Sequence, residues 1–124
     1  MQTYARWLFG FAAAGNLVVG AALIFAQQLF ARLLRLNAID GTNAVLAATA
    51  GVLIAGFGYG YLRIALDPGR FRPLIHVGAM GKLAAVATGA TFATLDRHAL
   101  GFLALVSGDA LLAALFLDYL RRSR

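Results

Sequence analysis

The sequence predicts an all-α integral membrane protein: one transmembrane domain, residues 1–124, built as an antiparallel four-helix transmembrane bundle. Hydrophobic residues make up 61% of the chain and charged residues only 13%, against about a quarter charged in soluble domains. A soluble chain this short has too much surface for its volume to bury so many apolar side chains. The apolar runs are continuous and lack the alternation of a membrane β-barrel. The bilayer is therefore the expected solvent.

Four apolar runs each exceed the roughly 20 residues that a helix needs to cross the hydrocarbon core. The first is longer than the core of a signal peptide, so we expect it to be a retained span. The predicted spans are Trp7–Phe30, Ala44–Leu66, Pro73–Leu95 and Ala99–Leu120.

The breaks between the runs contain turn-forming residues. Residues 40–43 (DGTN) supply a turn and then an N-cap, Asn43, for the second helix. Residues 67–69 (DPG) form the second turn, and Pro73 suits the first position of the third helix. Residues 96–98 (DRH) make a tight polar reversal. Residues 29–36 either continue the first helix obliquely along the membrane surface or form its frayed end.

The arginines predict an orientation. Seven lie on the side of the two termini and three on the other side, so the positive-inside rule places both termini in the cytoplasm. Four aromatic residues are expected to anchor the spans at the same boundary: Tyr4, Trp7, Tyr61 and Tyr119. We also expect Asp118 to pair with Arg121 or Arg122, one helical turn away.

Three polar residues fall near the middle of three different spans: Asn16, Lys82 and Asp109. From the helical rise per residue, we expect all three to lie roughly 14–17 Å from the cytoplasmic ends of their spans. An unpaired charge at the bilayer centre costs about 3 kcal/mol on insertion scales. We therefore expect Lys82 and Asp109 to pair inside the bundle, with the Asn16 amide completing their hydrogen bonds.

Small residues recur on the helix faces that carry these polar groups, where they allow close helix contact in lipid. The same small residues could leave room for a ligand, but we expect tight packing. The stripes are Gly78–Ala85–Gly89 beside Lys82, Ala12–Gly20 beside Asn16, and the pair Gly56 and Gly60.

Several functional classes are disfavoured. The chain has no cysteine and no glutamate, and no nucleophile–base constellation is recognisable, so we expect no enzyme, no metal and no cofactor. A net charge of +6 does not predict nucleic-acid binding, because no water-exposed domain carries it. His76, near the cytoplasmic boundary, is expected to form interfacial hydrogen bonds rather than bind a metal.

The chain resembles a set of small four-span bacterial membrane proteins, distantly similar to the DoxX-like group. The resemblance covers about half the chain and implies the fold more than an activity, because that group has no single agreed function. The matching residues are Gly60-Tyr61, Asp67-Pro68, Arg72-Pro73, Gly81-Lys82 and Gly108-Asp109.

The sequence favours two functions over a third, which is a membrane enzyme that acts on a lipid or quinone. The first is an accessory or scaffold subunit that associates with other membrane protein subunits, or with copies of itself, in a bacterial inner membrane. The alternative is a carrier or binder of a small or lipid-like molecule. Its candidate binding residues are Asn16, Lys82 and Asp109, with Gly56, Gly60 and His76 nearby.

Overall fold

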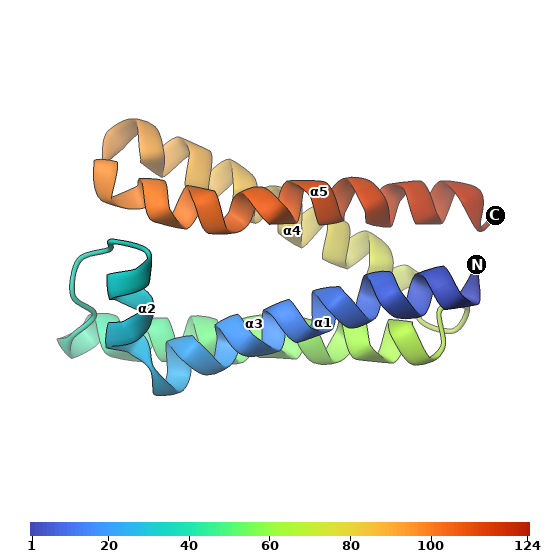
Figure 1. Ribbon diagram of the computed structural model, residues 1–124, viewed down its shortest axis with the longest axis horizontal. Coiled ribbons are helices and arrows are strands. Elements are labelled where there is room, and N and C mark those ends of the chain that lie inside the picture. Colours follow the sequence, from blue (N-terminus) through green and yellow to red (C-terminus); the bar gives the residue numbers. More distant parts are fainter.

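The chain forms four long helices and two short ones, which confirms the predicted all-α bundle (Figure 1). The computed structural model describes residues 1–124. Four helical segments, Gln2–Phe25, Gly41–Leu66, Arg72–Leu95 and Arg97–Arg122, are long and apolar enough to cross a membrane. The elements are α1 (Gln2–Phe25), α2 (Gln27–Leu33), α3 (Gly41–Leu66), α4 (Arg72–Leu95), the 3₁₀ helix η1 (Arg97–Ala99) and α5 (Leu100–Arg122).

The long helices run antiparallel in chain order and form two pairs, α1 with α3 and α4 with α5 (Figure 1). Small residues bring the first pair together. A β-carbon on Gly20 would lie 2.7 Å from the Gly51 carbonyl oxygen, and one on Gly51 would lie 2.7 Å from that of Gly20. Gly58 also faces α1, since its β-carbon would lie 3.2 Å from the Ala13 carbonyl oxygen. Close backbone contact of this kind holds helices together in lipid.

The predicted packing role of Gly56 and Gly60 is wrong. A β-carbon on Gly56 would meet nothing within 4 Å, and one on Gly60 would only reach Leu74 at 4.0 Å. Residues two positions apart on a helix point about 200° apart. Gly58 therefore faces α1 while its two glycine neighbours point away from it, so the pattern identified the correct segment but the wrong face.

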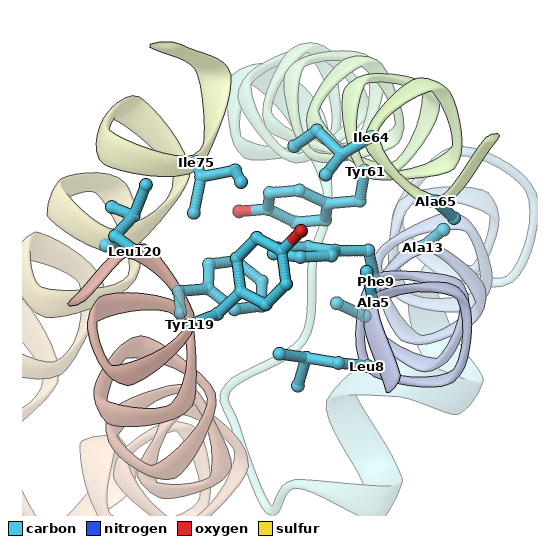
Figure 2. Packing of buried hydrophobic residues seen from close by; sticks show 13 residues of the cluster. Ala5, Leu8, Phe9, Ala13, Tyr61, Ile64, Ala65, Ile75, Tyr119 and Leu120 are labelled. Carbon is cyan, nitrogen blue, oxygen red and sulfur yellow. The ribbon is translucent and has the colours of Figure 1, made fainter. Parts of the chain in front are cut away.

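The hydrophobic core (Figure 2) occupies the end of the bundle that holds both termini (Figure 1). Aromatic rings from three helices meet there: the ring centroids of Phe9 and Phe116 are 4.7 Å apart, and those of Tyr61 and Phe116 are 5.3 Å apart. Tyr61 and Tyr119 are 2% and 6% exposed, so they are core residues and not the predicted interfacial anchors. The core consists of Ala5, Leu8, Phe9, Ala12, Ala13, Tyr61, Ile64, Ala65, Ile75, Ala79, Phe116, Tyr119 and Leu120.

The first predicted span is shorter than expected at its far end. The helix breaks at Ala26, where φ is −136° and ψ is 48°, and α2 turns out of the axis of α1 toward α5 (Figure 1). The Gln27 side chain donates a 2.8 Å hydrogen bond to the Ala44 carbonyl, which ties α2 to the start of α3. Residues 27–33 are thus a separate helix and not a frayed end of α1. α3 begins at Gly41, after Asp40, so the predicted N-cap Asn43 lies inside the helix.

The remaining connections are close to their predicted positions. α4 begins at Arg72, with Pro73 in its first turn. Arg72 donates a 2.6 Å hydrogen bond to the Leu120 carbonyl, which satisfies a free carbonyl group at the end of α5. In the far turn, the His98 amide donates to the Asp96 carboxylate at 2.9 Å. This bond holds the pKa of the Asp96 carboxyl below its usual value.

Close packing at Gly20 has a measurable consequence. We expect Gly20→Ala to lower the free energy of unfolding by about 1–3 kcal/mol, because the added methyl group must displace backbone atoms of α3. Gly56→Ala is the matched control and should raise it by up to about 1 kcal/mol through helix propensity alone. Thermal unfolding in detergent measures both. Equal effects of the two substitutions would contradict the α1–α3 contact.

Candidate binding site

The structure brings Asn16 of α1, Lys82 of α4 and Asp109 of α5 together. The Lys82 Nζ donates to Asp109 Oδ1 at 2.6 Å and to Asn16 Oδ1 at 3.4 Å. The Asn16 Nδ2 donates in turn to the Ile54 carbonyl of α3 at 3.1 Å. The cluster therefore joins all four long helices, and the pairing of Lys82 with Asp109 that the sequence predicts is present.

The small residues beside Lys82 explain its inward position. A β-carbon on Gly78 would lie 2.6 Å from the Tyr61 ring, and one on Gly89 would lie 3.0 Å from the Val106 side chain. Both glycines hold α4 close to its neighbours. Lys82 lies between them on the same face and is 4% exposed, whereas the side chain of Asp109 is 27% exposed.

Two aromatic rings complete the surroundings of the ammonium group. The Lys82 Nζ lies 5.1 Å from the ring centroid of Tyr61 and 5.9 Å from that of Phe116. An aromatic face attracts a cation at such distances. The sequence assigned no such role to Tyr61 or Phe116. The only signal for Tyr61 is its spacing from Ile64 and Ala65, which places all three on one face of α3.

An apolar cavity of about 540 Å³ adjoins the polar cluster. Its volume falls in the range of small-molecule sites, about 300–1,000 Å³. The expectation of tight packing throughout the bundle is therefore wrong, although it holds at Gly78 and Gly89. Most of the lining residues are apolar, and the lining comprises Phe11, Ala12, Gly15, Asn16, Val19, Leu23, Phe30, Ile54, Phe57, Tyr61, Gly81, Lys82, Ala85, Phe102, Leu105, Val106, Gly108, Asp109, Leu111 and Leu112.

The cavity extends from the polar cluster toward α2. Phe30 of α2 and Phe102 of α5 border its far end, and the Leu34 carbonyl, just after α2, packs directly against Gly101 of α5. The opposite end is bounded by Tyr61 and by Leu112, which packs against the hydrophobic core. Asn16, Lys82 and Asp109 thus lie where the solid core ends and the cavity begins.

One side of the cavity is open, between α1 and α5. Phe11 and Leu111 are exposed wall residues there, and β-carbons on Gly15 and Gly108 would meet nothing within 4 Å. On the opposite side Phe57 closes the gap between α3 and α4, since a β-carbon on Gly81 would lie 3.5 Å from its ring. The opening faces outward at mid-span, where a membrane protein meets lipid tails.

The other candidate residues lie outside the cavity. Gly56 is exposed on the outer face of α3, and Gly60 does not line the cavity either. His76 is exposed and borders a separate hollow near the chain termini. Asp118 forms the predicted ion pair with Arg122, at 2.9 Å, far along α5 from the polar cluster.

Comparison with known protein families, with curated proteins and with solved structures finds no match to this chain.

Coupling between Lys82 and Asp109 can be measured with a double-mutant cycle. We expect Lys82→Met and Asp109→Leu each to lower the free energy of unfolding by about 3 kcal/mol, because each leaves a charge without its partner. The double substitution should recover much of that loss. Chemical unfolding in detergent gives the three values, and strictly additive losses would rule out the ion pair.

Proposed function

We propose that this protein binds, and carries within the membrane, a small amphipathic molecule whose polar head reaches the Lys82–Asp109 pair. The observation that supports the proposal best is the position of the cavity. Its walls are apolar, and its polar groups gather at one end. A largely apolar site with a few convergent polar groups is the usual form of a small-molecule site.

The arrangement of hydrogen bonds favours a particular head group. Lys82 already donates to Asp109 and Asn16, and the Asn16 amide donates to Ile54. Asp109 Oδ2 has no hydrogen-bond partner within the chain, and Asp109 borders the cavity. The Lys82 ammonium group is buried against Tyr61 and Phe116, whereas the Asp109 side chain is 27% exposed. The accessible free polar atom is thus an acceptor, in an ion pair of zero net charge. A neutral ligand with a hydroxyl or N–H donor fits this site best.

The open side of the cavity favours a ligand that arrives from the lipid. A molecule in the bilayer can pass between α1 and α5 at Gly15 and Gly108 without crossing the polar ends of the bundle. An apolar tail then remains in contact with apolar surface along the whole route. A long-chain alcohol or a similar lipid-like molecule satisfies both the donor requirement and this route.

An accessory or scaffold subunit remains the second candidate. Its contacts would be the exposed apolar side chains of the helices, such as Trp7, Phe25 and Leu95. Lipid requires the same apolar surface, so these side chains do not favour a protein partner over the bilayer. A scaffold role does not explain the cavity, and for this reason we place the carrier function first. The resemblance to the DoxX-like group and the absence of enzymatic activity stay predictions.

Farnesol, a neutral long-chain alcohol, tests the proposed ligand class. We expect the purified protein in detergent to bind farnesol in native mass spectrometry, and to bind farnesyl methyl ether about tenfold more weakly because the ether cannot donate to Asp109. Gly15→Leu should block farnesol binding by filling the open side. Leucine is a better helix former than glycine, so this variant should fold.

Gly10→Leu is the matched control, because Gly10 also has open space around it and does not line the cavity. It should bind farnesol like the unaltered protein. Equal binding of farnesol by the Gly15 and Gly10 variants would contradict occupancy of the cavity. Equal binding of the alcohol and the ether would contradict the donor requirement alone.

We further propose that the protein lies in a bacterial inner membrane with both termini in the cytoplasm. The basis is the seven-to-three distribution of arginines between the two ends. We expect a cytoplasm-active reporter fused after Arg124 to be active, and a periplasm-active reporter to be active when inserted in residues 34–40. The reverse pattern of activities would show the opposite orientation.

A further inference from the structure

A second hollow, of about 330 Å³, lies between the start of α4 and the end of α5. It is at the end of the bundle where both termini lie (Figure 1), well away from the polar cluster and its cavity. Basic groups predominate in its lining, which consists of Arg72, His76, Leu117, Leu120, Arg121 and Arg124. No acidic side chain borders it.

The end of α5 meets the start of α4 at this hollow. Arg72 and His76 are four residues apart on α4 and share a helix face. Arg121 lies in the last turn of α5, Arg124 follows the end of that helix, and both border the hollow. Arg72 is held in position, because its guanidinium donates to the Leu120 carbonyl at 2.6 Å and to the Ser123 hydroxyl at 2.5 Å. The hollow therefore has one fixed arginine and two arginines on the opposite wall.

The nearest acidic residue of α5 does not neutralise the basic side chains that line the hollow. Asp118 pairs with Arg122 at 2.9 Å, and neither residue borders the hollow. Arg121 forms no ion pair within the chain. Three arginines line the hollow with no acidic side chain among them, and an anion between their guanidinium groups would reduce their mutual repulsion.

The geometry of the wall groups indicates which anion fits. Guanidinium groups match the oxygens of phosphate in planar, paired hydrogen bonds, and a hollow lined by several of them selects phosphate groups. Leu117 and Leu120 add an apolar side to the hollow. Basic pockets between transmembrane helices on the cytoplasmic side bind the head groups of anionic lipids.

We propose that this hollow is a phosphate-binding site. Its ligand is a phosphate group carried either by an anionic phospholipid or by a free phosphate ion. Both ligands would occupy the same arginine-lined space, and they differ in whether an acyl chain contacts Leu117.

The test uses the full chain and two arginine variants that differ in position alone. Arg121→Gln removes a wall residue of the hollow, whereas Arg122→Gln removes an equal charge that pairs with Asp118 outside it. Binding is measured by native mass spectrometry with phosphatidic acid, and by calorimetric titration with inorganic phosphate. Both substituted residues are exposed, and thermal unfolding confirms that each variant is folded.

We expect Arg121→Gln to weaken phosphatidic acid binding by about tenfold or more, because a charge-assisted hydrogen bond is lost, and Arg122→Gln to change it less than twofold. Saturable binding of inorganic phosphate with the same dependence on Arg121 would identify free phosphate as sufficient. Binding of phosphatidic acid alone would identify the lipid. Equal losses of phosphatidic acid binding in the two variants, or no binding of either probe, would overturn the proposed site.

Discussion

A bilayer cannot solvate a charge, and this constraint governs how the two helix pairs meet. Lys82 belongs to the α4–α5 pair and has its carboxylate partner, Asp109, on that same pair. Asn16 extends the hydrogen bonds to α1 and, through the Ile54 carbonyl, to α3. The 3.4 Å hydrogen bond from Lys82 to Asn16 is the one that crosses between the two pairs. It links them at the depth of the ammonium group.

The packing of the bundle changes at that depth. On the side of the termini, Phe9, Tyr61 and Phe116 fill the space between the pairs, and their rings contact one another. On the far side α1 and α5 separate, and a cavity replaces the core. The rings of Tyr61 and Phe116 also lie against the Lys82 ammonium. The same aromatic residues therefore close the core on one face and stabilise the buried cation on the other.

The sequence was sufficient to predict the helices and the ion pair, because both follow from local chemistry. Apolar length defines the spans, and two opposite charges at similar depth have few alternatives to pairing. The sequence was not sufficient to predict the cavity, since a stripe of small residues permits either close packing or open space. Gly78 and Gly89 pack closely, whereas Ala85 between them borders the cavity. Whether a small residue packs closely depends on the residue opposite it, which is Tyr61 for Gly78 and Val106 for Gly89. Only the fold brings those residues near.

The break between α1 and α2 at Ala26 determines which residues border the far end of the cavity. A straight first helix would carry Phe30 onward along the axis of α1, away from the space between the pairs. Because the helix breaks, Phe30 borders the cavity instead, and the Leu34 carbonyl packs on Gly101. Only glycine allows that approach, since a β-carbon at position 101 would collide with the carbonyl group. The position of α2, and with it the length of the cavity, thus depends on one small residue of α5. Separation of the two helix pairs is consequently limited at both ends: by the aromatic core near the termini and by the contact of the α2 segment with α5 at the far side.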